Sequence, residues 1–469
     1  MNIELVLIDL MTPIRFFLLS FFISAYCTAQ DSLNCSIKLD SVCKLSLRVP
    51  VFDFPQNTIS QQRYPSMVQA EAFSTDLYEL GYWGIDGFGD KLFKRKNKEY
   101  TTAKRIGNFT FKYLLGFGFS KYGSELPIPL GVWAHEEFHR SVLAVNGISS
   151  KNGNWILHRW DGTVYGVSDS ALYNLKCTDN DQLLYSYVAG VQFEIVQNQK
   201  ITIQDFYKKR SLNKNSLLLY NAFYVYNYFK FSTSTLSDSV KLLAVPHESK
   251  NASERDFAGA DLTAWAYDMF WPDSSYFIRD HFPEGEGVNR RIGFSELPAD
   301  AQQFLNEQKK LSLINFLNPA IFFVNRINIG RTFSFNMLAS YAPTHFGNAI
   351  GVHVPFKYKN FDFLLNLQNY NNYQHKMYGL GVALYNYPFS KKWSGDIAVS
   401  LWEQPLSFFE AQGVKGGKVE VAAKYSFNKN LQAFFSFSAK SDGWQIGDPY
   451  LKKNESFQIG INYTMQKPI

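Results

Sequence analysis

Apolar and polar residues alternate along the last third of the chain. In the segment KVEVAAKYSF, residues 418–427, apolar side chains occupy nearly every second position, which is the period of a β-strand with one apolar face. The same period recurs in further segments of about ten residues, separated by turns rich in Asn, Gly, Lys and Pro. These segments are 320–330, 332–341, 349–358, 361–370, 378–387, 394–402, 431–440 and 457–465. The pattern predicts about eight or nine antiparallel strands.

Two architectures use this alternation. A soluble β-sandwich has it, and so does a transmembrane β-barrel, whose smallest outer-membrane form closes with about eight strands. The barrel is favoured because the outward faces would be strongly aromatic for a solvent-facing sheet. Each strand is also about as long as a tilted membrane strand. We therefore predict an outer-membrane-type β-barrel over residues 319–469.

The residues before this sheet follow a mixed and largely helical pattern. The segment Ser216 to Phe231 is apolar with interspersed Tyr and Asn, which predicts a buried core helix. Residues 276–318 begin with a Gly-rich charged stretch, continue with a short helical pattern and end at Asn318-Pro319, as a connector between structural units does. The expected fold class is α+β, with a mainly helical domain followed by a C-terminal antiparallel β-barrel of about eight strands.

Composition narrows the class of protein. The chain has 469 residues, of which 17% are aromatic and 19% are charged, and its mean hydropathy is -0.20. This mixture argues against a bundle of transmembrane helices and suits a barrel whose strands are apolar only at alternate positions. The formal net charge of +6 is small for this length, so we expect no nucleic-acid partner.

The N-terminal residues are typical of an export signal. Arg15 is followed by the apolar run 16–26 and then by a small-residue context that ends at Ala29. We expect residues 1–29 to be a signal peptide and the chain to be exported. Together with the barrel, this predicts an outer-membrane protein that contacts outer-membrane lipid, with its remaining domain facing the periplasm or the cell surface.

A candidate metal site lies in the sequence GVWAHEEFHRSVLAVNG. On a helix, His135 and His139 point the same way, so both imidazoles can bind one Zn²⁺. Glu136 projects beside the metal, where a carboxylate can accept a proton from water that the metal activates. Gly147 follows as a left-handed helix cap. Two histidines on one helix face also arise by chance, but the chain has only 8 His and the motif has apolar neighbours.

A catalytic zinc ion usually takes three protein ligands and leaves a position for water. Glu194 lies in an otherwise apolar helical run, where a lone carboxylate is unfavourable unless it is paired or bound to metal. Asp261 opens a second helical pattern after Gly259. An ordinary helix cap accounts equally well for Asp261, and a hydrogen bond to the histidines accounts for Glu194. We predict Glu194 as the third ligand first and Asp261 second.

The His-Glu-x-x-His motif resembles that of the zincin metalloproteases. The order of the following segments is similar, more narrowly, to the site-2 proteases, in which the motif helix is followed by a β-hairpin, an Ala-Gly-Pro-x-x-Asn helix and an Asp ligand near a Gly. Here the motif is followed by GNWILHRWDGTVYGV, with a turn predicted at Asp161-Gly162, then by AGVQFE and then by GAD. The resemblance covers about Gly131 to Asp261, and its motifs after the first are short.

The chain also departs from the site-2 protease pattern. Val191 replaces the Pro of the Ala-Gly motif, Glu194 stands at its Asn position, and no Leu-Asp-Gly occurs. Site-2 proteases place their site among long membrane helices, whereas no run here reaches about 18 apolar residues. We therefore expect a zincin-like metalloprotease domain outside the lipid, over residues 106–275, preceded by an N-terminal region at 30–105.

The leading functional hypothesis is a zinc-dependent peptide hydrolase anchored at the bacterial outer membrane. It binds zinc through His135 and His139, with Glu194 or Asp261 as the third ligand and Glu136 as the general base, and it acts on a peptide or protein substrate. The alternative is a non-enzymatic outer-membrane binding or structural protein whose metal site is inert or structural. In a third interpretation the helical part plugs or caps the lumen of the barrel.

Overall fold

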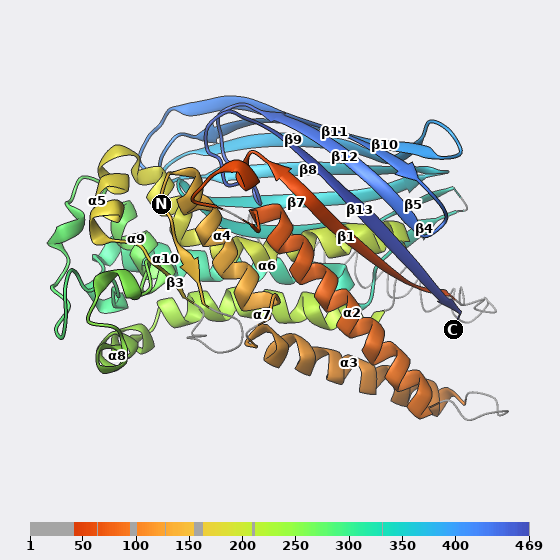
Figure 1. Ribbon diagram of the computed structural model, residues 1–469, viewed down its shortest axis with the longest axis horizontal. Coiled ribbons are helices and arrows are strands. Elements are labelled where there is room, and N and C mark those ends of the chain that lie inside the picture. The colour runs from red at the N-terminus through yellow and green to blue at the C-terminus, as the bar shows by residue number, and fades with distance from the viewer. Residues whose placement is uncertain are drawn as a thin grey trace, which may run out of the picture.

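A computed structural model describes residues 42–62, 64–93, 101–126, 128–153, 163–208, 212–330 and 332–468. The predicted signal peptide, residues 1–29, lies outside the described residues. The fold is α+β, as predicted: helices occupy most of the first half of the chain, and an antiparallel sheet occupies the last third. The sheet arches over the helices, so the molecule has a β layer and a helical layer (Figure 1).

The helical layer contains both long and short α-helices. The longest, α6, spans Asn180–Lys208 and lies directly beneath the arch of the sheet (Figure 1). The others are α2 (Met67–Phe93), α3 (Thr102–Ser124), α4 (Gly131–Val145), α5 (Asp169–Thr178), α7 (Asn215–Ser232), α8 (Thr235–Ala244), α9 (Asp261–Phe270) and α10 (Ala299–Ser312). The helix predicted at 216–231 is confirmed as α7, although part of it, including Phe223, is exposed. The predicted connector contains α10.

Each segment in which alternation predicted a strand contributes residues to the sheet. The first of them, 320–330, is mostly not extended, and the second, 332–341, is divided between two strands. Residues 319–322 form a 3-10 turn, and only Ile327–Ile329 pair as a strand. The strands are β4 (Ile327–Ile329), β5 (Phe333–Phe335), β6 (Leu338–Thr344), β7 (Gly347–Tyr358), β8 (Phe361–Asn371), β9 (Lys376–Pro388), β10 (Trp393–Pro405), β11 (Gly413–Ser426), β12 (Leu431–Lys440) and β13 (Asn454–Pro468).

The prediction of a closed barrel of about eight strands was wrong. The sheet has 11 strands in the order β1-β13-β12-β11-β10-β9-β8-β7-β5-β4, with β6 also paired to β7, and within the described residues its two edges do not pair. β1 (Val42–Phe54) comes from the predicted N-terminal region and adds to the sheet beside β13. An eight-stranded barrel encloses only side chains, whereas this sheet curves around whole helices and stays open.

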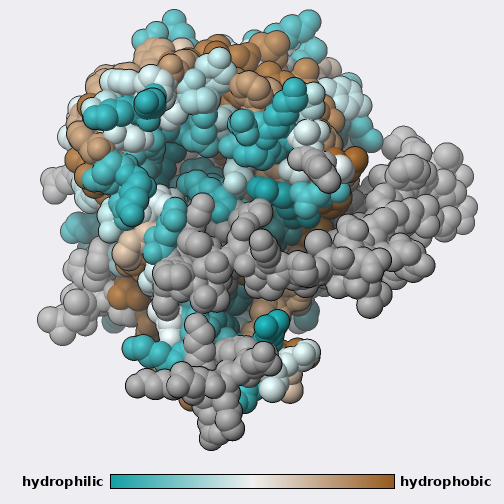
Figure 2. All heavy atoms as spheres, turned by 90° about the vertical axis from the view of Figure 1, so that its right-hand side faces the viewer, coloured by the Kyte–Doolittle hydropathy of each residue, from teal (hydrophilic) through white to brown (hydrophobic). Residues whose placement is uncertain are grey.

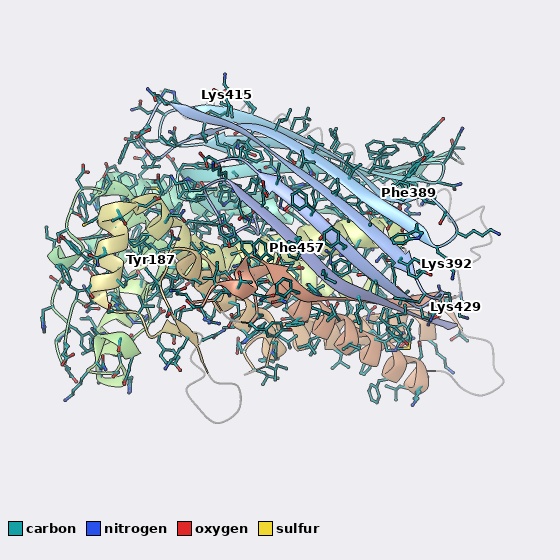
Figure 3. All side chains as sticks on the ribbon, turned by 45° about the horizontal axis from the view of Figure 1, so that its top comes forward. Tyr187, Phe389, Lys392, Lys415, Lys429 and Phe457 are labelled. Atoms are coloured by element: carbon teal, nitrogen blue, oxygen red, sulfur yellow. The ribbon has the colours of Figure 1, made fainter. Side chains whose placement is uncertain are left out.

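The inner face of the sheet carries small residues in β9 and is joined to α6 by hydrogen bonds at β6. In β9 the inward positions Gly379, Gly381 and Ala383 are small, and Gly381 and Ala383 are buried. Direct bonds join the layers: Gln192 of α6 donates to the carbonyl of Pro343 in β6 at 2.7 Å, and Gln199 donates to the Ser340 hydroxyl at 3.0 Å. Side chains project from both faces of the sheet (Figure 3). The two hydrogen bonds hold α6 against the sheet.

The two faces of the sheet differ in polarity. Seen from one end, hydrophobic residues border the upper outline of the molecule and hydrophilic residues gather beneath them (Figure 2). Among the described residues, no helix combines the length and the hydropathy needed to cross a membrane.

Candidate metal centre

The helix α4 carries the histidine pair of the sequence motif. Its N-terminus follows Leu130, and Gly147 just after its C-terminus adopts a φ of 78°, the left-handed conformation that favours glycine. The helical spacing of four residues places His135 and His139 on the same face. Both side chains are buried, with 2% and 1% of their surface exposed. They are therefore core residues of the helical layer and not part of a solvated helix face.

Asp261 is the first residue of α9 and faces these histidines. Gly259, two residues earlier, has a φ of 70°, and a Cβ at this position would lie 2.6 Å from the backbone of Arg290. Glycine is therefore required for the turn that delivers the aspartate. Arg291 donates to the Gly259 carbonyl at 2.6 Å, and the backbone N–H of Gly259 donates to Asp256 at 3.1 Å. These contacts fix the position from which Asp261 enters the site.

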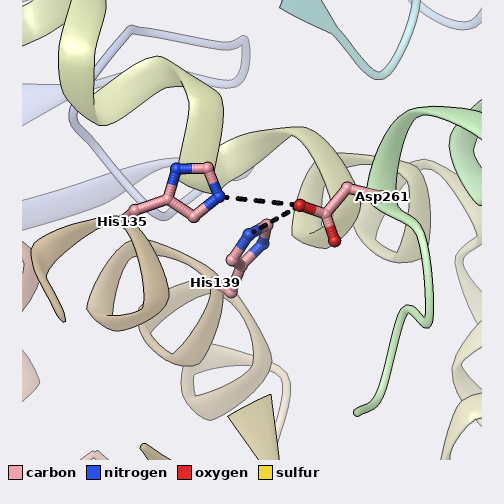
Figure 4. A group of neighbouring side chains, drawn as sticks. All are labelled: His135, His139 and Asp261. Atoms are coloured by element: carbon pink, nitrogen blue, oxygen red, sulfur yellow. Dashed lines mark ion pairs between the residues drawn. The ribbon is translucent and has the colours of Figure 1, made fainter. Parts of the chain in front are cut away.

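The three side chains converge on a small volume (Figure 4). Oδ2 of Asp261 lies 3.3 Å from Nε2 of His139 and 3.6 Å from Nε2 of His135. One ligand atom from each residue lies within 4.8 Å of the other two. Ligands at about 2.0–2.2 Å from a shared zinc ion are separated from one another by distances of this order. The group could therefore hold a metal ion.

The other nitrogen of each imidazole has a partner that sets its orientation. Nδ1 of His139 donates to the backbone carbonyl of Ser186 at 2.6 Å. Nδ1 of His135 lies 3.3 Å from Oε1 and 3.4 Å from Oε2 of Glu194. Because a carbonyl and a carboxylate only accept, both Nδ1 atoms carry the proton and both Nε2 atoms present a lone pair in the neutral form. This is the arrangement that metal-binding histidines need.

Two observations show that the residues fit a metal ion. Nε2 of His139 is buried and makes no hydrogen bond within the described residues, although buried polar atoms are normally satisfied. Gly190 of α6 packs over the pair, and a Cβ there would lie 2.1 Å from Nε2 of His139 and 2.4 Å from Nε2 of His135. The missing side chain leaves space at about the zinc–nitrogen distance from both histidines.

Electrostatics also favour a cation. Burial alone lowers the pKa of His135, but the carboxylates of Glu194 and Asp261 outweigh burial and raise it well above its usual value. Burial alone raises the pKa of Asp261, yet the two histidines hold it well below its usual range. Burial dominates for Glu194, whose pKa is raised. Buried carboxylates around two imidazoles need compensating positive charge, which a divalent metal ion would provide.

Glu136 and two tyrosines complete the surroundings. Glu136 is 6% exposed and interacts electrostatically with His135, the residue before it. From α7, Tyr228 donates to Oδ2 of Asp261 at 2.5 Å. The rings of Tyr224 and Tyr228 contact His135 edge-on at 5.9 and 5.8 Å between centroids. Both tyrosines are partly buried.

The structure brings all five predicted site residues into one region but divides their roles. His135, His139 and Asp261 form the group with ligand atoms close together. Glu194, the first choice as third ligand, faces the opposite nitrogen of His135 from that group. The geometry therefore favours Asp261 as the third ligand, while Glu194 orients a histidine.

Sequence reasoning missed three contributors to the site. Gly190 was visible only as part of the Ala-Gly pair in AGVQFE, and its packing over the histidines could not be read from that pair. Ser186 acts through its backbone, which carries no sequence signal. Tyr228 lies in an aromatic-rich helix in which no single residue stood out.

The predicted hairpin after the motif is described only at its base. The short strands β2 (Lys151–Asn152) and β3 (Val164–Tyr165) pair antiparallel, and the turn predicted at residues 161–162 lies outside the described residues.

Comparison with known proteins does not identify a family for this chain, since no protein-family model and no curated protein sequence matches it.

Proposed function

We propose that the protein is a zinc-dependent peptide hydrolase of the zincin type, with a site-2-protease-like order of segments. The observation that carries the proposal is the buried His135, His139 and Asp261 group with Glu136 beside it. Nitrogen and oxygen ligands in this number suit zinc, and they leave a coordination position open, as catalytic sites do. When bound, the zinc ion supplies Lewis acidity, which makes water acidic near neutral pH and polarises a carbonyl group.

The protein's own residues then have distinct tasks. Glu136 accepts a proton from the attacking water on a carboxylate oxygen. It delivers that proton to the amide nitrogen as the C–N bond breaks, so that the products are a carboxylic acid and an amine. Glu194 and the Ser186 carbonyl keep both Nδ1 atoms protonated and the imidazoles oriented. Tyr228 holds the carboxylate of Asp261 in place.

Glu136 separates the hydrolase from the alternative of a structural or inert metal site. A structural site has no use for a carboxylate at this position, whereas hydrolysis requires a proton acceptor. The test is Glu136→Gln, assayed for zinc content and for cleavage of a mixture of quenched fluorescent peptides. We expect zinc content to be unchanged and cleavage to fall at least ~100-fold, which is within the range of general-base catalysis.

The matched control is Glu284→Gln, which neutralises an exposed glutamate far from the motif in sequence. This variant should cleave the peptides at the parent rate. Equal cleavage by the parent and Glu136→Gln would exclude Glu136 as the base. No cleavage by a zinc-loaded parent on any peptide of the mixture would favour a structural metal site in a non-enzymatic protein.

Outer-membrane anchoring is also part of the proposal. It is supported by the signal-like sequence at 1–29 and by the alternation of the C-terminal strands. The proposed partners are a peptide or protein substrate at the metal and membrane lipid at the sheet.

A further inference from the structure

The outer face of the sheet is apolar over its whole central width. Strand β9 illustrates the pattern. Leu380 and Val382 are 50% and 52% exposed, whereas the residues that follow each of them, Gly381 and Ala383, are buried. In β10, Leu401 is 62% exposed and its neighbour Trp402 is 5% exposed. In the middle of these two strands the exposed positions are therefore apolar. A water-soluble sheet shows the reverse, with polar residues outward.

Strand register joins these positions into continuous rows. Val354 of β7 pairs with Leu365 of β8, which pairs with Val382 of β9, then Val399 of β10 and Val419 of β11. This row crosses neighbouring strands without one charged or hydrogen-bonding side chain. Contiguous exposed apolar surface of this extent marks an interaction site.

A second row runs parallel to the first, nearer to one end of the sheet. It consists of Phe356, Phe363, Leu384, Ile397, Val421 and Phe437, paired strand by strand from β7 to β12. It is again wholly apolar. We call the surface formed by these two rows the apolar band.

The extent of apolar surface along a strand matches the hydrocarbon region of a membrane. In β9, exposed or half-exposed tyrosines at positions 378 and 387 bracket the band. At ~3.3 Å per residue this segment is ~30 Å long, and a strand tilt of ~40° reduces its height to ~23 Å. Outer-membrane proteins present an apolar band about 25 Å tall, flanked by aromatic residues.

An aromatic rim lies at the end of the sheet where the short turns are found. Phe389, Trp393 and Phe427 are 67%, 48% and 56% exposed. Ring contacts connect Tyr387 with Phe389 at 5.4 Å and Trp393 with Tyr425 at 5.0 Å. Amphipathic rings at the edge of an apolar band are the arrangement found at a membrane–water interface.

The turns beyond this rim carry only positive charge. Lys359, Lys391, Lys392 and Lys429 are exposed in the turns that join β7 to β8, β9 to β10 and β11 to β12, and none of these turns contains Asp or Glu. Figure 3 shows Phe389, Lys392 and Lys429 at the same end of the sheet, with Lys415 at the other. Clustered lysines next to an apolar surface complement anionic lipid headgroups.

We infer that the apolar band is a lipid-facing surface, on which bilayer hydrocarbon contacts the two rows while anionic phosphate headgroups contact the lysine turns. The occupant is a phospholipid bilayer and not a second copy of the chain. A protein partner would have no need for an aromatic rim and a lysine-only edge around an apolar surface of membrane thickness. The inference deepens the outer-membrane anchoring of the proposed function, on which it rests, and it is independent of the proposed hydrolase.

The test is flotation of the full chain, diluted from detergent, with vesicles of phosphatidylcholine alone or with ~30% phosphatidylglycerol. We expect the parent to float with both, and more completely with phosphatidylglycerol at low salt. The double variant Val382→Asp/Leu401→Asp places charge in the apolar band. Its floating fraction should fall at least five-fold, because charge on a lipid-facing strand is strongly unfavourable.

The matched control is Leu242→Asp/Leu243→Asp, which places the same charges on exposed positions of α8 outside the band. It should float as the parent does. Circular dichroism of every sample reports whether each variant keeps its fold. Zinc content is measured separately on the same samples, so failure of the lipid inference and failure of the metal proposal are distinguishable. A charged-band variant that floats like the parent would overturn the inference.

Two other outcomes would also count against a lipid-facing band. One is a parent that stays at the bottom of the gradient with both vesicle compositions. The other is a parent that forms a dimer without detergent and does not bind vesicles. If Val382→Asp/Leu401→Asp dissociates that dimer, a second copy of the chain is the occupant of the band. For the headgroup contact, Lys391→Glu/Lys392→Glu/Lys429→Glu should abolish the preference for phosphatidylglycerol. An unchanged preference would contradict that contact.

Discussion

Replacing Gly190 with alanine should close the metal site while leaving the chain folded. The added Cβ would lie 2.1 Å from Nε2 of His139 and 2.4 Å from Nε2 of His135. A nonbonded contact at a carbon atom needs about 3.5 Å or more, so both imidazoles must retreat by more than ~1 Å. The methyl group would also stand where zinc must lie, about 2.0–2.1 Å from both nitrogens.

The effect on stability is smaller than the effect on binding. Overpacking of a core costs about 1–3 kcal/mol, while alanine in place of glycine within a helix contributes about 0.8–1.0 kcal/mol. We therefore expect the metal-free variant to lose ~0–2 kcal/mol in free energy of unfolding. Zinc affinity should fall at least 100-fold, equivalent to about 2.7 kcal/mol, because neither histidine can reach its ligand position.

The assay is zinc titration against a competing fluorescent chelator, with urea unfolding in EDTA as the measure of fold. Gly118→Ala is the matched control, since Gly118 is also helical and nothing lies within 4 Å of the Cβ it would gain. This control should bind zinc as the parent does. Parent-like zinc affinity in Gly190→Ala would refute the placement of the metal between the two Nε2 atoms.

Further variants test the ligands, their support and the charge balance of the sheet. Asp261→Asn should lose zinc after dialysis while Glu194→Gln keeps it with affinity lowered about 10–100-fold, and the opposite ranking would make Glu194 the ligand. Tyr228→Phe removes the hydrogen bond to Asp261 and should weaken zinc binding about 10–100-fold by the same titration; an unchanged affinity would show that this bond does not support the site. Burial, and secondarily the nearby Asp448 carboxylate, raises the pKa of Asp53 to about 6, so ionised Asp53 opposes folding and its effect grows as pH rises from about 4 to about 6. Asp53→Asn should accordingly raise the free energy of unfolding at pH 7 by ~1–3 kcal/mol and flatten its decline between pH 4 and pH 6, whereas a loss of stability at pH 7 would contradict the shift.

Sequence alternation predicted the strands well because it reports the polarity on each face. The segments 349–358 and 418–427 became β7 and β11 with nearly the expected bounds. Alternation does not report what covers the inner face, and here that face packs on α6. It also gave no sign that β1, more than 400 residues away in the chain, pairs with β13. The alternation therefore could not predict whether the sheet closes into a barrel or stays open.

The sequence could predict only the part of the candidate site that depends on spacing within one helix. The four-residue interval in α4 fixed His135 and His139 on one face, and both lie there. The third ligand depends on how α6 and α9 approach α4, which no local pattern encodes. The sequence placed Glu194 ahead of Asp261 as the third ligand, but tertiary packing turned Glu194 toward Nδ1 and Asp261 toward Nε2 of His135.

The zinc content of the purified chain decides whether His135 and His139 form a metal centre. The parent and a His135→Ala/His139→Ala variant would be loaded with zinc, dialysed together and analysed for metal and protein. We expect about one zinc per chain in the parent and none above background in the variant, with similar circular dichroism for both. A folded parent that retains no zinc, or a variant that retains as much as the parent, would contradict a metal centre at these histidines.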